Sequence, residues 1–230
     1  MALILHIDTS GETAGIAISE SGKLVALKNN SQQKDHAAWL HPAVELLMKE
    51  NDRTLSALDA VSVTAGPGSY TGLRVGMATA KGLCYALNIP LITVSTLKAM
   101  ANAGRKWIRS SAIADGNNYL LCPMIDARRM EVFTAIFDQS LDLTLSERPM
   151  ILDETAFDEE LARSKIIFFG SGSEKLKSLN TNANALFQNI SWSVSDLVEL
   201  SEEKFGNRDF ADLAYTEPAY LKEFYTSWLN

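Results

Sequence analysis

Apolar residues near the start of the chain fall into three short runs that predict consecutive β-strands. Residues 3–7 form an apolar run typical of a central strand, and residues 14–19 and 24–28 are two further strand candidates. Turn-forming residues separate these runs at 8–12 and 20–23. The first thirty residues therefore predict a three-stranded β-meander.

The pattern becomes helical between residues 36 and 50, where apolar residues recur three and four positions apart. Asp35 precedes this run and is a candidate N-cap. Pro42 lies inside the run. Because proline lacks a backbone donor, we expect it to kink this helix or to mark its first turn.

A second strand-to-helix unit follows. Residues 60–65 form a β-rich run that leads through a glycine-rich loop, 66–72, into a helix over 73–87. Residues 90–94 are another strand, and Ser95 is expected to cap a helix that ends near Arg105. This order of strands and helices is typical of an α/β domain.

The second half of the chain repeats this order with thinner elements. A polar stretch at 109–118 separates the halves. The candidate elements after it are strands at 119–125, 131–137, 141–145 and 166–169, and helices at 154–163, from 173 onward and at 194–205. We therefore predict two related α/β lobes, residues 1–105 and a smaller lobe over residues 106–230.

Composition and charge exclude several classes of protein. With 47% apolar and 21% charged residues, the chain has the mix of a packed domain. Its net charge of −7 argues against a protein that binds nucleic acid by itself. No run approaches the roughly 18 apolar residues of a membrane span, and the N-terminus does not resemble a secretory signal. Two cysteines without a CxxC pair fit a reducing compartment, so we expect a cytoplasmic protein.

The usual patterns of catalytic and metal-binding sites are missing from the sequence. His36 and His41 are five residues apart, about 140° around a helix, so they do not share a face as a metal-binding pair does. Gly170-Ser171-Gly172 is not the Gly-x-Ser-x-Gly elbow of a serine hydrolase, and we interpret it as the turn before a helix. The sequence therefore predicts no catalytic residue and no metal site.

The loop at 66–72 carries the most chemical information. Its glycines allow a tight turn and a close approach to a ligand, and the helix start that follows offers N–H groups to an anion. Neither named phosphate motif is complete: Leu73 follows Gly72 where a P-loop needs lysine, and Thr71 stands at the third glycine of the dinucleotide motif. A phosphate or nucleotide loop and a plain strand-to-helix turn with an N-cap both stay open. The candidate residues in this loop are Gly66, Gly68, Ser69, Thr71 and Gly72.

The helix after this loop is apolar or small around most of its circumference. The residues responsible are Leu73, Val75, Met77, Ala78, Ala80, Leu83, Ala86 and Leu87. A helix of this kind is usually covered on all sides. Gly76, Ala80 and Gly82 would let another helix approach closely. Either the lobe's own sheet and neighbouring helix cover it, or a partner protein covers part of it.

Residues 66–76, Gly-Pro-Gly-Ser-Tyr-Thr-Gly-Leu-Arg-Val-Gly, resemble the hallmark of the TsaB (YeaZ) family, bacterial proteins of tRNA threonylcarbamoyladenosine synthesis that are related to TsaD. The resemblance extends from residue 3 to about residue 221. It implies the two-lobed fold of the actin, sugar-kinase and Hsp70 ATPases (the ASKHA fold), here with a reduced second lobe. The supporting matches are Ile7-Asp8-Thr9-Ser10, His36 with Leu40 and Pro42, Val94-Ser95-Thr96-Leu97, Asp126-Ala127-Arg128-Arg129 with Glu131-Val132, and Glu217-Pro218 with Tyr220-Leu221.

The resemblance also implies a role. The catalytic TsaD subunits carry a His-x-x-x-His metal pair, whereas Thr96 and Met100 occupy the corresponding places here. The chain is therefore expected to be a non-catalytic subunit that activates a TsaD-like subunit, together with a TsaE-like ATPase, and to reach tRNA only through the complex. No cofactor of its own is expected, and ATP or ADP would bind at the complex interface. Asp8, Thr9 and Ser10 join the loop residues as the candidate phosphate or nucleotide site.

The family's partner surface lies on the two helices at about 36–50 and 70–87. In this family these helices form a bundle with the matching helices of TsaD, or of a second copy in a homodimer. The residues predicted to line this interface are Trp39, Leu40, Ala43, Leu47, Tyr70, Leu73, Val75, Gly76, Met77, Ala80 and Leu83.

Two other classes of function stay open as alternatives. One is an active enzyme, either a nucleotide-dependent phosphotransferase or a metallopeptidase-like protein. The other is a plain nucleotide-binding module. The turn at 126–129 is also undecided: it could be a functional turn, or Asp126 could cap it while Arg128 pairs with Glu131.

Overall fold

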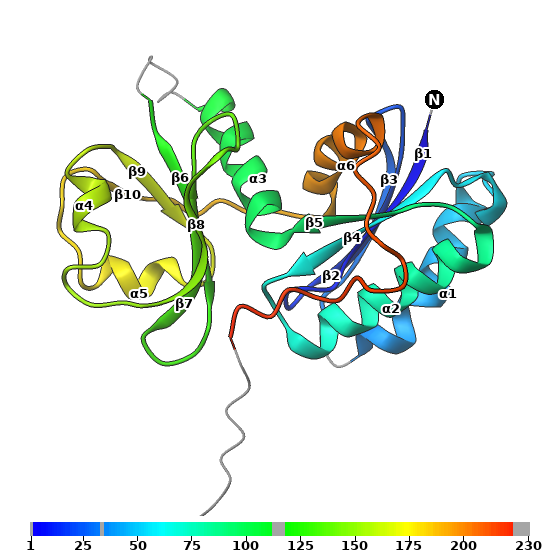
Figure 1. Ribbon diagram of the computed structural model, residues 1–230, viewed down its shortest axis with the longest axis horizontal. Helices are drawn as coiled ribbons and strands as arrows, with labels where there is room; N and C mark the ends of the chain where they lie inside the picture. The colour runs from blue at the N-terminus through cyan, green and yellow to red at the C-terminus, as the bar shows by residue number, and fades with distance from the viewer. Residues whose placement is uncertain (1, 33–34, 112–117, 223–230) are drawn as a thin grey trace, which may run out of the picture. The chain divides into compact units, whose positions relative to one another are not determined.

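The chain forms two compact α/β units in the computed structural model (Figure 1). The described residues are 2–32, 35–111 and 118–222. The first unit combines residues 1–106 with 191–218, and the second combines residues 107–190 with 219–230. Two α/β units, the second of them smaller, are what the hydrophobic pattern predicts.

The first unit is built on a five-stranded mixed sheet in the order β3-β2-β1-β4-β5. Its strands are β1 (Leu3–Asp8), β2 (Ala14–Glu20), β3 (Lys23–Asn30), β4 (Ala60–Gly66) and β5 (Leu91–Ser95). β1, β2 and β3 pair antiparallel, while β4 and β5 are added parallel to β1. Ser21 and Gly22 both have positive φ angles, which suits the two-residue turn of the predicted meander. β1 lies at the centre and is buried along its whole length.

Two helices cover one face of this sheet and a third helix covers the other face (Figure 1). They are α1 (His36–Glu50), α2 (Tyr70–Leu87) and α6 (Leu197–Gly206). Because side chains alternate along a strand, Leu5 and Val61 join the apolar core under α1 and α2. His6 and Ser62 pair in register, and Ser201 of α6 donates a hydrogen bond of 2.7 Å to the Ser62 hydroxyl.

The second unit repeats this topology, with strand order β10-β9-β6-β7-β8. Its strands are β6 (Leu120–Asp126), β7 (Glu131–Phe137), β8 (Leu143–Ile151), β9 (Ile166–Phe169) and β10 (Ala185–Phe187). β6 is central, β7 and β8 follow antiparallel, and β9 and β10 are parallel to it. Its helices are short: α4 (Asp158–Leu161) and α5 (Ser173–Lys177). The sequence predicts that the second half repeats the order of elements of the first half, and the structure shows that the two sheets also have the same topology.

The predicted bounds are least accurate in the second unit. The helix predicted over 154–163 is reduced to the four residues of α4. Asp153 explains this, because its Oδ1 accepts hydrogen bonds from the N–H and the hydroxyl of Thr155 at 2.9 and 2.8 Å and holds a turn where the helix was expected to begin. The strand predicted at 141–145 is longer than expected, and β10, with three residues, was missed.

Two predicted helix caps have different outcomes. Asp35 stands at the N-cap position of α1, but its side chain makes no capping hydrogen bond. Ser95 does cap α3 (Thr96–Ser110), because its hydroxyl accepts a hydrogen bond of 3.2 Å from the N–H of Lys98. α3 also continues past the predicted end near Arg105 to Ser110.

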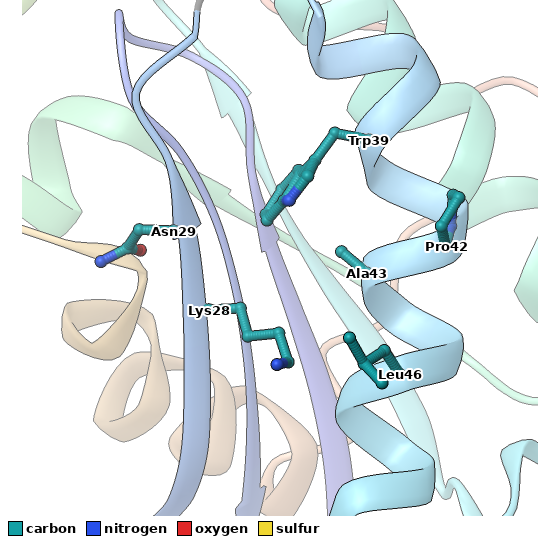
Figure 2. Close-up of a pocket in the computed structure, with 6 residues that line it drawn as sticks. All are labelled: Lys28, Asn29, Trp39, Pro42, Ala43 and Leu46. Carbon is teal, nitrogen blue, oxygen red and sulfur yellow. The ribbon is translucent and has the colours of Figure 1, made fainter.

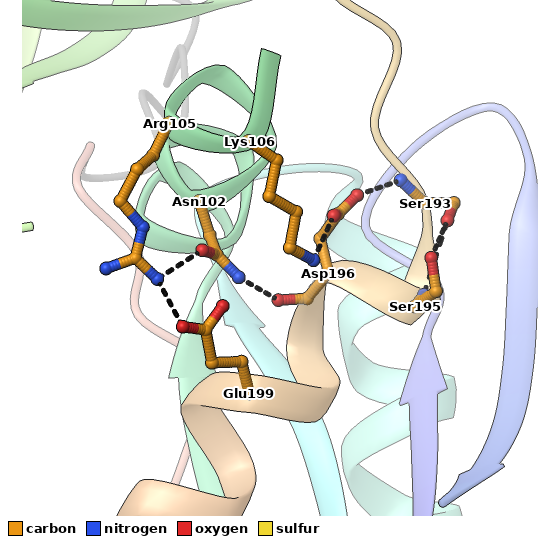
Figure 3. A network of polar contacts seen from close by, with 7 residues as sticks. All are labelled: Asn102, Arg105, Lys106, Ser193, Ser195, Asp196 and Glu199. Atoms are coloured by element: carbon orange, nitrogen blue, oxygen red, sulfur yellow. Dashed lines mark hydrogen bonds and ion pairs between the residues drawn. The ribbon is translucent and has the colours of Figure 1, made fainter. Parts of the chain in front are cut away.

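Residues 191–218 belong to the first unit, whereas the sequence assigns all of 106–230 to the second lobe. A polar network holds this segment on α3 (Figure 3). The side-chain amide of Asn102 donates to the backbone carbonyl of Asp196 at 2.9 Å, and Lys106 forms an ion pair of 2.9 Å with the Asp196 carboxylate. Arg105 forms an ion pair of 2.8 Å with Glu199. Hydrophobic periodicity does not reveal that the chain returns in this way, because these partners are distant in sequence.

Among the helices of the described residues, none is long and apolar enough to cross a membrane.

Candidate functional site

The structure brings together the two segments predicted as a phosphate or nucleotide site. The turn after β1, with Thr9 and Ser10, lies against the loop between β4 and α2. The N–H of Ser69 donates to the carbonyl of Ser10 at 2.7 Å, and the hydroxyl of Thr9 donates to the carbonyl of Gly72 at 2.7 Å. The Ser69 hydroxyl in turn accepts from the N–H of Gly72 at 3.3 Å, as an N-cap does.

The glycines of this loop are required by the packing of the chain against itself. A β-carbon at Gly72 would lie 2.0 Å from the carbonyl oxygen of Thr9, and one at Gly68 would lie 2.4 Å from that of Ser10. A β-carbon at Gly76, one turn after Gly72, would lie 2.3 Å from the Thr9 hydroxyl. These positions therefore favour a tight strand-to-helix turn, with the 9–10 turn in contact with the start of α2.

Asp8 closes the end of β1 and organises the turn that follows. Its Oδ1 accepts hydrogen bonds from the N–H of Ser10 at 3.0 Å, from the Ser10 hydroxyl at 2.7 Å and from the Thr64 hydroxyl at 2.7 Å. Burial raises the pKa of Asp8, and the hydrogen bonds from Ser10 and Thr64 and the nearby His36 oppose this rise. The carboxyl group therefore fixes the 8–10 turn against β4.

Most of the residues predicted to line the partner interface pack inside the first unit itself. The buried ones are Leu40, Ala43, Leu47, Leu73, Gly76, Met77 and Ala80. The physical reason is that α2 has the sheet on one side and α1 beside it, so its broad apolar surface is covered within the unit. The partly buried ones are Trp39, Tyr70, Val75 and Leu83. The buried side chains form the core and are not a surface for a partner.

The exposed side of α2 instead carries small residues at helical spacing. Arg74, Ala78 and Gly82 are exposed and follow one another four residues apart, and Tyr85 is 82% exposed at the end of the row. A β-carbon at Gly82 would meet nothing within 4 Å. The row therefore offers a shallow strip on which another helix has space to pack closely. The four-residue spacing of Arg74, Ala78 and Gly82 is visible in the sequence. The interface prediction instead used the apolar residues of α2, most of which are buried.

α1 borders this strip with a polar side of its own. Ala38, His41 and Glu45 are exposed and lie on one side of α1. His41 Nε2 lies 3.5 Å from the hydroxyl of Thr79, so the two helices meet here. We call these two rows of exposed residues together the α1–α2 strip: Ala38, His41, Glu45, Arg74, Ala78, Gly82 and Tyr85.

Trp39 lies in a separate cavity of about 400 Å³ between β3 and α1 (Figure 2). Pro42, Ala43 and Leu46 line its α1 side, while Lys28 and Asn29 come from β3. Lys28 forms an ion pair of 2.7 Å with Glu50. This predicted interface residue is thus placed on the β3 side of α1, and not beside α2.

The structure shows how Asp126 and Glu131 pair in the turn between β6 and β7, which the sequence alone does not decide. Asp126 Oδ1 accepts from the N–H of Arg128 at 2.6 Å, so Asp126 caps the turn. Asp126 also forms an ion pair of 2.7 Å with Lys175, which lowers the pKa of its carboxyl group. Glu131 pairs with Lys222 and not with Arg128.

A metal site finds no support in the described part of the chain. No group of three His, Cys, Asp or Glu side chains there has the arrangement to hold an ion. Thr96 and Met100, the two positions that the sequence resemblance equates with a histidine pair, are both buried at the start of α3. A hydroxyl and a thioether there would be poor ligands for the hard or borderline cations expected of such a pair.

Comparison with known proteins gives consistent results. The family model described as "TsaD: tRNA N6-adenosine threonylcarbamoyltransferase" matches residues 23–222. The "tRNA threonylcarbamoyladenosine biosynthesis protein TsaB" of Bacillus subtilis (strain 168) is 38% identical over 134 residues, which is 58% of this chain and 54% of that protein. The Escherichia coli (strain K12) protein of the same name is 24% identical over 226 residues, covering 95% of this chain and 94% of that protein. The chain thus spans about half the length of the first relative and nearly all of the second.

Solved structures show the same fold. A Pseudomonas aeruginosa crystal structure, described as an uncharacterized protein with similarity to peptidase YeaZ, has a TM-score of 0.81 at 26% identity and covers 96% of this chain and 100% of that chain. A second structure, YeaZ from Pseudomonas aeruginosa, has a TM-score of 0.78 at 24% identity, with the same coverage of 96% and 100%. Both likenesses extend over the two units.

Proposed function

The chain belongs to the TsaB (YeaZ) branch of the TsaD family, and from this membership we propose that it is a non-catalytic, activating subunit of the complex that makes N6-threonylcarbamoyladenosine in tRNA. Its role would be to bind a TsaD-like catalytic subunit and hold it in the active shape. A TsaE-like ATPase would complete the assembly, and the chain would act in the cytoplasm. Any ATP or ADP would bind at the interface with the partner.

The observation that carries this proposal is the α1–α2 strip. Because the partner belongs to the same family, it has equivalent helices, and two helix pairs of this kind can pack as a four-helix bundle. Ala78 and Gly82 would let the partner's backbone approach α2 closely, while Arg74 and Glu45 would lie at the polar edge. In the absence of the partner, a second copy would use the same strip in an isologous homodimer.

An exposed position in the strip allows a test that leaves the core intact. In Ala78→Arg, a long charged side chain would stand where the partner helix must approach. We expect the dissociation constant for the TsaD-like subunit, measured by calorimetry, to rise at least roughly tenfold, because an unpaired charge is buried on binding. The melting temperature should stay unchanged, because Ala78 is exposed in the free chain.

Ala162→Arg is the matched control, because it makes the same substitution at an exposed position after α4 in the second unit. It should bind the partner as the wild-type chain does. The proposed surface is wrong if Ala78→Arg remains folded and binds with unchanged affinity. Arginine at Met77 would be a poor test, because Met77 is buried in the core and its replacement would unfold the first unit.

A further inference from the structure

Two consecutive arginines occupy left-handed backbone positions in the turn between β6 and β7. Arg128 has φ 71° and Arg129 has φ 46°. Residues with a β-carbon are less stable than glycine in this region, and asparagine is the usual non-glycine occupant. The turn therefore carries two long cationic side chains where short residues would be more stable. Strain of this kind is typical of positions whose side chains have a function.

The charges around the turn leave these arginines without partners. Asp126 is paired with Lys175, and Glu131 is paired with Lys222. Arg128 and Arg129 are exposed, and neither forms an ion pair with any residue that the structure describes. The carboxylates of Asp126 and Glu131 are thus paired with lysines, and the positive charges of Arg128 and Arg129 remain at the end of the hairpin of a chain with net charge −7.

The turn is also held in place by the start of α5. The N–H of Asp126 donates to the Ser171 hydroxyl at 3.1 Å, and Lys175 donates to the carbonyl of Glu131 at 3.1 Å. Gly172 packs so closely that a β-carbon there would lie 2.6 Å from a methyl group of Val132. A turn fixed in this way loses little conformational entropy when a ligand binds.

We propose that Arg128 and Arg129 form a contact site for the phosphodiester backbone of the tRNA that is presented to the assembled complex. Arginine binds phosphate oxygens through its planar fork of N–H groups. The two side chains project from an exposed hairpin end, whereas small ligands bind in concave sites, so an extended polyanion fits better than a free nucleotide. This inference rests on the proposed function, because the acidic chain is expected to meet tRNA through its partner.

The test replaces the pair by the residues that the backbone prefers, in the double variant Arg128→Asn/Arg129→Gly. Binding of a labelled, unmodified tRNA transcript to the complex with the TsaD-like subunit is followed by fluorescence anisotropy over a series of salt concentrations. We expect roughly tenfold weaker binding and a slope of log K against log salt that is smaller by about 1 to 2, as for the loss of two phosphate contacts. The melting temperature should rise, because asparagine and glycine relieve the strain.

The opposite direction of these two effects separates a binding role from a structural one. A purely structural pair would change stability and leave tRNA affinity and the salt slope at the wild-type values, and that result would overturn the proposal. A second test variant, Arg128→Gln/Arg129→Gln, removes the two charges of the turn. Its matched control is Arg148→Gln/Arg163→Gln, because all four arginines are exposed in the second unit and both variants lose two charges. An equal loss of tRNA binding in the control would also overturn it.

Two further arms distinguish this proposal from the proposed function. If the chain does not bind the TsaD-like subunit, the proposed function fails, and the same variants are then titrated with tRNA as isolated chains at low salt. If the isolated wild-type chain binds tRNA and the Asn/Gly variant does not, the result supports the arginine site. If the variant binds as well as the wild-type chain, or if the wild-type chain does not bind tRNA at all, the arginine site is rejected. ADP and inorganic phosphate are added as competitors. If ADP or inorganic phosphate displaces the tRNA at micromolar concentration, the two arginines form a site for small anions, and the proposal that they bind RNA is rejected.

Discussion

His6 lies in the middle of β1 with its ring completely buried. One ring nitrogen, Nε2, is 2.7 Å from the Ser19 hydroxyl, while Nδ1 is buried without a hydrogen-bond partner among the described residues. Burial lowers the pKa of His6 from 6.5 to about 3, because the charged ring would lose its hydration. His6 is therefore neutral in the folded chain over the range in which it would ionise when unfolded.

This burial predicts a specific acid sensitivity. Below pH 6.5 the unfolded chain binds a proton at His6 that the folded chain refuses until about pH 3. The free energy of unfolding therefore falls with decreasing pH in this window, by about 1.4 kcal/mol per pH unit. His6→Gln removes this titration, so the loss of stability between pH 7 and pH 5, measured by urea unfolding, should be smaller by about 2 kcal/mol than in the wild-type chain.

Asp8, on the same strand, acts in the opposite direction. Its pKa is raised in the folded chain, so its contribution to stability increases as pH falls and is lost as pH rises through the folded pKa. It is present in both proteins of the His6 comparison, so the difference between them isolates His6. Equal losses of stability in the two proteins would contradict the assignment.

Alanine substitutions at two glycines of α2 are expected to change the free energy of unfolding in opposite directions. Gly72→Ala would place a β-carbon 2.0 Å from the Thr9 carbonyl oxygen, which requires the 9–10 turn to move. We expect a loss of about 3 kcal/mol or more in the free energy of unfolding. Gly82→Ala meets nothing within 4 Å, so it should stabilise the chain by about 0.5–1 kcal/mol through helix propensity. Urea unfolding of both variants measures this difference, and equal effects would show that the close packing at Gly72 is not required.

At the scale of elements, α2 illustrates how far the sequence can predict the site. Its end at Leu87 and the turn before it follow from the glycines and the apolar run, because both are local signals, but the helix begins at Tyr70 and not at the predicted Leu73. The side of α2 that faces outward does not follow, because Met77 and Ala80 on the buried side and Ala78 and Gly82 on the exposed side are all apolar or small. Only the position of α1 and the sheet decides between them.

In the second unit, too, the sequence does not predict the bounds of the helices or the partners of the turns. α4 and α5 have four and five residues, too few to show a helical period, so their bounds depend on turn contacts such as those of Asp153. The turn at 126–129 was recognised as a candidate, but its partner Lys175 is distant in the sequence. Local pattern therefore located the turn, and only the fold identified which charges neutralise one another.

At the scale of the whole molecule, the chain path inserts most of the second unit, residues 107–190, between two segments of the first unit. The chain leaves the first unit after Lys106 and returns at Ser191. The returning segment then supplies α6, whose buried residues Leu197 and Leu200 cover the face of the sheet that carries His6. Asn102 is fully buried where it binds the carbonyl of Asp196, so this junction is part of the core of the first unit.

This path predicts that the boundary suggested by the sequence does not delimit a stable unit. A chain ending at residue 106 would lack α6 and would expose one face of the sheet, so it should aggregate or lack a cooperative unfolding transition. A chain in which residues 1–106 are joined to 191–218 by a short flexible linker should unfold cooperatively, because it restores the contacts of Asn102, Arg105 and Lys106. Circular dichroism during urea unfolding compares the two. Cooperative unfolding of the shorter chain would contradict the role given to the returning segment, since the first lobe would then be complete without it.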